Sequence, residues 1–118
     1  MLRNYRKPLV IAAPKIGLKH PKAVSNLTEF GPGTKFMPTL AKDFTDGGIK
    51  KVVLCSGKVA FDIEAAIEKA GGNPGIRLIR VEEIAPFPVN DLRSYMGSID
   101  KDAEVYWVQE ESLNQGAF

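Results

Sequence analysis

A strand, helix, strand pattern near the middle of the chain constrains the fold more than any other feature. Residues 52–55 form a short apolar run, VVLC, and residues 58–70 carry apolar side chains at helical spacing. Residues 76–81, IRLIRV, form a second short run that is rich in β-branched side chains. A chain that alternates strands and helices in this way builds a mostly parallel sheet with helices on its faces. The pattern therefore predicts an α/β domain.

The details of this unit support separate predictions for its helix and its second strand. The helix over residues 58–70 should end at Gly71 and Gly72, because glycine adopts the backbone conformation that closes helices. In residues 76–81 apolar and basic side chains alternate, which is typical of a strand with one solvated or partner-facing side.

Four more segments have recognisable patterns. Residues 9–13, LVIAA, are a continuous apolar run closed by Pro14, as expected for a strand buried on both sides. Residues 104–108, EVYWV, predict a fourth strand, and residues 89–99 repeat the apolar spacing of a helix. A weaker helical pattern covers residues 21–30.

Residues 31–48 contain two prolines and four glycines without sustained periodicity, so we expect a linker and a domain boundary there. The sequence stops at Phe118, just after a glycine, where an open α/β unit would add another helix and strand. We therefore expect a truncated domain.

Composition excludes several classes of protein. The 16 basic and 14 acidic side chains are dispersed, which argues against a nucleic-acid or polybasic membrane surface. The apolar run at residues 9–13 is far shorter than the ~20 residues that span a bilayer. Cys55 has no second cysteine to pair with, which fits a reducing compartment, and its apolar surroundings predict a buried, inert thiol.

The best candidate site is the turn Ser56-Gly57-Lys58, which leaves a buried strand and opens a helix. Backbone N–H groups at a helix start attract phosphate or carboxylate groups, and Ser56 and Lys58 would add donors. The complete phosphate-loop pattern is missing. The alternative interpretation is structural, with Ser56 as the helix N-cap and Lys58 as a solvated residue of the first turn.

Two acidic pairs follow predicted strands, Glu82-Glu83 and Glu110-Glu111. Both should lie at the carboxyl edge of the sheet, where α/β proteins bind ligands. Such carboxylates could perform acid-base chemistry if one pKa were raised, or they could cap a helix or bind a neighbouring arginine.

Two aromatic residues have simpler interpretations. His20 has no second histidine, cysteine pair or acidic cluster at metal-ligand spacing, so a surface-loop position is favoured. Trp107 lies in the predicted fourth strand, where packing is favoured over ligand stacking.

Three stretches, in order along the chain, resemble the 2-oxoglutarate dehydrogenase family: RKPLVIAAPKIGLKHPKAVS, VVLCSGKVAFDI, and RVEEIAPFPVNDL followed by YWVQEESLNQGAF. The opening RNYRKPLVIAAPK looks more like the 2-oxoadipate-preferring paralogue of animals. A looser likeness extends to the last domain of transketolases and of other 2-oxo acid dehydrogenases.

The resemblance implies a three-layer α/β/α fold with a mostly parallel sheet, as in the C-terminal domain of transketolase. Residues 1–30 would be the closing strand and exit of the domain that binds the cofactor's pyrimidine ring. Residues 31–48 would be the linker, and residues 49–118 an incomplete C-terminal domain.

The resemblance also implies a function for the parent protein. It would use thiamine diphosphate and Mg²⁺ to decarboxylate 2-oxoglutarate or 2-oxoadipate, in the tricarboxylic acid cycle or in lysine degradation, and pass the acyl group to a lipoyl-bearing acyltransferase. It would be a homodimer in the mitochondrial matrix, or in the cytoplasm of a bacterium. The family's cofactor, metal and catalytic motifs lie outside this segment, which implies no catalytic or metal-binding residue here and an inactive fragment.

For the segment itself, the resemblance implies roles in assembly and regulation, with no nucleic-acid or membrane partner. Some bacterial members bind acetyl-CoA in this region, so Ser56, Gly57 and Lys58 are candidates for binding an effector phosphate. The alternative is a stand-alone nucleotide-binding regulatory module of the same fold, and fold alone does not separate the two.

Overall fold

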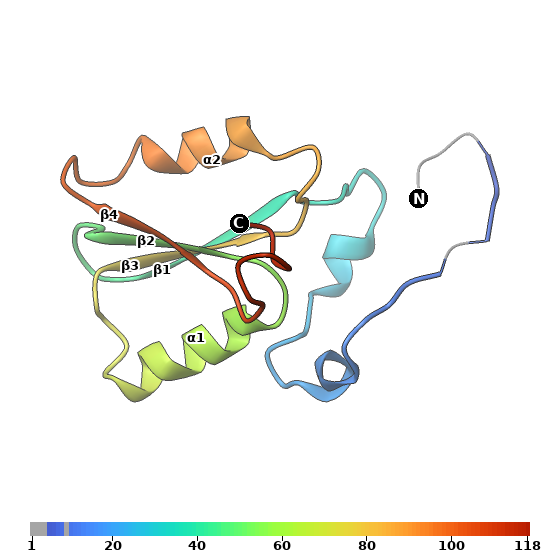
Figure 1. The fold of residues 1–118 in the computed structure, drawn as a ribbon, viewed down its shortest axis with the longest axis horizontal. Helices are drawn as coiled ribbons and strands as arrows, with labels where there is room; N and C mark the ends of the chain where they lie inside the picture. Colours follow the sequence, from blue (N-terminus) through green and yellow to red (C-terminus); the bar gives the residue numbers. More distant parts are fainter. Residues whose placement is uncertain (1–4, 9) are drawn as a thin grey trace.

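A four-stranded mixed sheet forms the centre of the computed structural model, which describes residues 5–8 and 10–118 (Figure 1). The strands are β1 (Thr39–Phe44), β2 (Lys51–Cys55), β3 (Ile76–Val81) and β4 (Glu104–Val108). Their order across the sheet is β1-β3-β2-β4, with β2 parallel to both β3 and β4 and β1 antiparallel to β3. The predicted α/β class is confirmed, and three of the four strands begin and end within one residue of their predicted bounds.

Two α-helices lie on opposite faces of this sheet (Figure 1). Helix α1 (Val59–Lys69) packs its buried Ala60 and Ile67 against a cluster that includes Leu78 of β3. Helix α2 (Val89–Met96) buries Leu92 in the cluster on the other face. Within the described residues, no helix is long and apolar enough to cross a membrane.

The glycine pair after α1 ends the helix as the sequence predicts. The N–H of Gly72 donates to the carbonyl of Ile67 at 2.9 Å, and the N–H of Gly71 donates to the carbonyl of Glu68 at 3.2 Å. These two hydrogen bonds form a Schellman motif, which needs a residue with positive φ directly after the helix. Gly71 has this conformation, with a φ of +106°. Helix α2, in contrast, ends at Met96, three residues before its predicted end.

Strand β1 lies inside the segment that we expect to be a linker without regular structure, and that expectation is wrong for residues 39–44. Only the first and last residues of β1, Thr39 and Phe44, are buried, so the sequence TLAKDF lacks the alternation that reveals a strand. Its hydrogen bonds come from β3, with Leu40 opposite Arg80 and Asp43 opposite Arg77. The strand is therefore a product of tertiary pairing.

The two arginines of β3 correct a second prediction. Arg77 and Arg80 are three residues apart, so they lie on opposite faces of the strand and do not form one solvated side. Arg80 lies over the ring of Phe61 on the α1 face, 5.3 Å from its centroid. Arg77 contacts the end of α2. Both faces of β3 are consequently packed.

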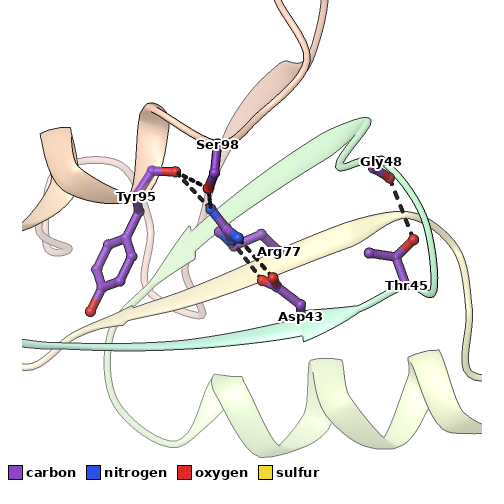
Figure 2. Close-up of polar contacts among 6 residues, drawn as sticks. All are labelled: Asp43, Thr45, Gly48, Arg77, Tyr95 and Ser98. Atoms are coloured by element: carbon purple, nitrogen blue, oxygen red, sulfur yellow. Dashed lines mark hydrogen bonds and ion pairs between the residues drawn. The ribbon is translucent and has the colours of Figure 1, made fainter.

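Arg77 joins three elements through its guanidinium group (Figure 2). It donates two hydrogen bonds of 2.7 Å to the carboxylate of Asp43 on β1. It also donates to the carbonyl of Tyr95 at 2.6 Å and to the hydroxyl of Ser98 at 2.7 Å, both at the end of α2. These bonds fix the edge strand and the second helix to β3 and hold the pKa of Asp43 below its ordinary value.

The N-terminal part departs most from its predictions. Residues 10–13 of the predicted strand 9–13 are not in a strand, and Leu9 lies outside the described residues. Val10 is 93% exposed, and no strand among the described residues lies beside this segment to share backbone hydrogen bonds. In place of a helix over residues 21–30, only a short 3₁₀ helix forms at Leu27–Phe30, and another forms at Lys15–Lys19. An isolated helical segment this short is not stable without packing, and both 3₁₀ helices lack buried residues.

Candidate functional site

The carboxyl edge of the sheet holds a pocket of about 330 Å³. Strands β2, β3 and β4 are parallel, so the segments that follow them meet at this edge. The pocket is lined by residues from all three of these segments: Ser56, Gly57, Ile84, Trp107, Gln109, Glu111, Gln115, Gly116 and Ala117. The convergence predicted from the strand order is therefore present, with the C-terminal residues as an additional wall.

The turn Ser56-Gly57-Lys58 lies at this edge, and its geometry differs from the structural interpretation of the sequence. The residue at the N-cap of α1 is Lys58, not Ser56, and no side chain caps the helix. Gly57 has a φ of +75°, a conformation that favours glycine. Lys58 is not simply solvated, since its ammonium group contacts the carboxylate of Glu110 after β4. That hydrogen bond raises the pKa of Lys58 above its ordinary value.

The acidic pairs have structural partners. Glu82 accepts a hydrogen bond of 2.8 Å from Arg80, and its backbone N–H donates to the carbonyl of Pro38 at 2.8 Å. Glu83 donates to the same carbonyl at 3.1 Å. For Glu82 and Glu110, the contacts with Arg80 and Lys58 favour the structural interpretation, in which an acidic residue beyond a strand binds a neighbouring cation.

Cys55, at the end of β2, is fully buried in the cluster beneath α1, as predicted. Burial raises the pKa of its thiol to about 11, and the nearby guanidinium of Arg80 opposes this only in part. The thiolate is the reactive form of cysteine, so at neutral pH this side chain behaves as an apolar core residue.

The two aromatic candidates are both in packing contacts. His20 is in a loop, as predicted, and its ring stacks on Phe61 of α1 with centroids 4.5 Å apart. Its Nδ1 accepts a hydrogen bond of 3.2 Å from the backbone of Lys22. Trp107 packs against the cluster beneath α2, in agreement with its predicted role.

Sequence reasoning missed Gln109, which organises the C-terminal wall of the pocket. Its amide oxygen accepts a 2.7 Å hydrogen bond from the indole N–H of Trp107, and its amide nitrogen donates to two backbone carbonyls further along the chain. The available signal was its position, because Gln109 is the first residue after β4 and precedes the turn-forming residues Asn114 to Gly116. Within the described part of the chain, no group of three or more His, Cys, Asp or Glu side chains could hold a metal ion.

The sheet order, the helix on each face and the pocket at the carboxyl edge define an α/β domain of the kind that binds ligands or partner domains where its parallel strands end. The sequence matches the 2-oxoglutarate dehydrogenase C-terminal family over residues 24–118, and the chain belongs to that family.

Relatives with this segment occur in animals and bacteria. The chain is 40% identical over 117 residues to the probable 2-oxoadipate dehydrogenase complex component E1 homolog of Caenorhabditis elegans, covering 98% of this chain and 13% of that protein. It is 39% identical over 118 residues to the 2-oxoadipate dehydrogenase complex component E1 of Rattus norvegicus, with the same coverage. It is 40% identical over 120 residues to the 2-oxoglutarate dehydrogenase E1 component of Rickettsia felis, covering all of this chain and 12% of that protein. The chain thus spans about one eighth of the length of these relatives.

Proposed function

We propose that this chain is the C-terminal part of a subunit that decarboxylates 2-oxoglutarate or 2-oxoadipate and passes the acyl group to a lipoyl-bearing acyltransferase. The observation that carries the proposal is the family match over residues 24–118, which includes every strand of the sheet and both α-helices. The similarity to E1 components of both kinds supports it and does not favour a stand-alone regulatory module.

Within that subunit, the chain serves assembly. Its sheet with a helix on each face supports a three-layer fold like the C-terminal domain of transketolase. Residues 1–30 would be the exit of a pyrimidine-binding domain, and residues 49–118, together with the edge strand β1, would form the C-terminal domain. Large apolar side chains before β1, among them Val10, Leu18 and Leu27, are exposed and would be covered by the rest of a homodimeric subunit.

Cofactor binding and decarboxylation would take place in parts of the subunit outside this chain. Thiamine diphosphate and Mg²⁺ would be bound there, and the cofactor would supply the carbanion chemistry of decarboxylation. The subunit would work in the mitochondrial matrix, or in the cytoplasm of a bacterium. This proposal is in keeping with relatives named from both animals and Rickettsia felis.

A segment exchange tests the proposal. We expect a chimaera in which this chain replaces the aligned segment of the Caenorhabditis elegans relative to decarboxylate its 2-oxo acid at a rate within about tenfold of the parent, because related cores tolerate substitution when their pattern is kept. The assay measures consumption of 2-oxoglutarate and 2-oxoadipate with thiamine diphosphate and Mg²⁺ present.

The control is the same chimaera carrying Leu78→Asp, which places an unpaired carboxylate in the core and should abolish both assembly and activity. A chimaera that is folded and dimeric but inactive would contradict the proposal. So would activity of the relative after deletion of the whole aligned segment.

We also propose that the turn Ser56-Gly57-Lys58 receives the phosphate of an effector such as acetyl-CoA or AMP. The turn precedes α1 and opens onto the pocket at the carboxyl edge, so backbone N–H groups and the Lys58 ammonium could meet an anion together. Glu110 already contacts Lys58, so an incoming phosphate would have to displace that carboxylate.

Removing this competitor should strengthen anion binding. We expect Glu110→Gln to lower the Kd for AMP by about threefold, a small factor because the ion pair is exposed to solvent. Isothermal titration on the intact subunit measures it. Asp62→Asn is the matched control, since it removes one negative charge from the first turn of α1 without freeing Lys58. If Lys58→Ala leaves the affinity for acetyl-CoA and AMP unchanged, no phosphate binds at this turn.

A further inference from the structure

The segment after β4 folds back on its own strand around one side chain, Gln109. The amide oxygen of Gln109 accepts hydrogen bonds from the indole N–H of Trp107 at 2.7 Å and from the backbone N–H of Phe118 at 3.3 Å. Its amide nitrogen donates to the carbonyls of Glu111 at 3.0 Å and Ser112 at 3.2 Å. A glutamine amide has two donor hydrogens and two acceptor lone pairs, so this one uses its full capacity.

The contacts of this segment with the rest of the fold are otherwise few. It contains neither helix nor strand, and its internal backbone hydrogen bonds run only from Gln115 and Gly116 to the carbonyl of Ser112. Leu113 and Phe118 are 73% and 78% exposed, so apolar burial does little to hold it. The Gln109 amide is therefore the main polar connection between the tail and β4.

Gly116 shows how closely the tail approaches that amide. A side-chain carbon at this position would overlap all three terminal atoms of Gln109, the amide carbon, oxygen and nitrogen. A side chain at residue 116 would push the flexible end of Gln109 aside, so the bonds of its amide depend on a glycine at this position.

We infer that Gln109 is a latch that closes residues 110–118 over the carboxyl edge of the sheet and that the pocket at this edge exists only while the latch is closed. Gln115, Gly116 and Ala117 form one wall of the pocket, and Gln109 itself lines it. Releasing the amide frees that wall, because the segment has no regular structure and its side-chain ion pair with the rest of the fold, between Glu110 and Lys58, is exposed to solvent. The inference stands independently of the proposed enzymatic role, since it concerns contacts within this chain.

Hydrogen exchange tests the latch directly. We expect Gln109→Ala to accelerate exchange of the hydrogen-bonded amides of Gln115, Gly116 and Phe118 by about tenfold, with β2 and β3 unchanged, because loss of the latch opens the tail locally. Emission from Trp107, the only tryptophan in the chain, should shift to the red as its indole loses its partner. Gln115→Ala is the matched control, since it removes an amide from the same segment and leaves Gln109 in place.

A charged substitution distinguishes loss of the Gln109 hydrogen bonds from a general destabilisation of the segment. In Gln109→Glu, an ionised carboxylate faces the carbonyls of Glu111 and Ser112 and has no hydrogen to donate, so the tail should be as open as in Gln109→Ala at about pH 8. At about pH 3.5 the introduced carboxyl is largely protonated, because this pH lies below the ordinary glutamate pKa of about 4.3, and protection of the tail should return. The titratable groups nearby are Glu110, which is paired with Lys58, and the side chain of Glu111, and both are present in Gln109→Ala as well.

Protection is calculated relative to the intrinsic exchange rate at each pH, so the pH dependence of the intrinsic rate does not affect the comparison. Gly116→Ala provides an independent route to the open state, because it displaces the Gln109 amide without removing it. Wild-type protection of the amides of Gln115 and Gly116 in Gln109→Ala or Gly116→Ala would overturn the inference. Protection in Gln109→Glu that is the same at both pH values would overturn it too.

Discussion

Replacing Ile79 with alanine should lower the free energy of unfolding by about 2–5 kcal/mol, the range for truncating a large aliphatic side chain in a close-packed core. Ile79 is 0% exposed and lies in β3, with Leu54 of β2 opposite on one side and Ala41 of β1 on the other. Its side chain belongs to the cluster beneath α2 that also contains Leu92. Truncation therefore leaves a cavity that strands on both sides prevent from collapsing.

Urea denaturation followed by circular dichroism measures this loss, and a domain of this size has roughly 5–15 kcal/mol to lose. Ile84→Ala is the matched control, because it deletes the same atoms from a half-exposed side chain beyond β3 and should cost less than about 1 kcal/mol. Equal losses for the two variants would mean that β3 is not the centre of the core.

The central strand, helix, strand unit was predictable because its signals are local. The apolar run of β2, the helical spacing of apolar residues over 58–70 and the paired glycines Gly71 and Gly72 each specify one feature, and they agree with one another. The meeting of the segments after β2, β3 and β4 also followed from sequence, since parallel strands share a carboxyl edge.

Features that depend on distant partners were not predictable. Strand β1 forms because the free edge of β3 lies beside it, and TLAKDF carries no periodicity of its own. Residues 10–13 have the composition of a buried strand, but no partner strand lies beside them among the described residues. Composition describes what a segment could bury, whereas a strand exists only where a neighbour accepts its hydrogen bonds.

In the candidate site, too, local features were predictable from the sequence and contacts between distant residues were not. The position of the Ser56-Gly57-Lys58 turn was predictable from the end of β2 and the start of α1. The contact between Lys58 and Glu110 was not, because 52 residues separate the two side chains and no pattern in the sequence relates them. This pairing links two of the segments at the carboxyl edge, while the acidic residue that lines the pocket itself is Glu111.

Replacing Arg77 with methionine should lower the free energy of unfolding by about 2–3 kcal/mol, because bonds from a guanidinium to a carboxylate and to backbone acceptors are charge-assisted. The side chain of Arg77 is 12% exposed, and its loss leaves the carbonyl of Tyr95 without this donor. Methionine retains most of the aliphatic volume, so the loss reports the hydrogen bonds rather than a cavity. Arg93→Met, on the exposed face of α2, is the matched control and should change stability by less than about 0.5 kcal/mol.

The pH dependence identifies Asp43 as the partner responsible. Its pKa is lowered from the ordinary value of 3.8, first by the hydrogen bond from Arg77 and then, after a smaller opposing effect of burial, by the charge of that guanidinium. A carboxyl whose pKa is lower in the folded state contributes stability that is fully present above the unfolded pKa and disappears as the pH falls through the folded pKa. The wild-type chain should therefore lose this contribution below about pH 4, whereas Asp43→Asn should lack it at every pH.

In Arg77→Met the carboxyl of Asp43 loses the hydrogen bond and the charge that depress its pKa, so the difference in stability between this variant and wild type should shrink as the solution is acidified. Urea denaturation at about pH 7 and about pH 3 measures that difference at each pH. A difference that stays constant with pH would mean that Arg77 stabilises the fold only through the end of α2. The bidentate contact across β1 and β3 would then be unnecessary for holding the edge strand, although Asp43 and Arg77 are directly opposite in the register of the sheet.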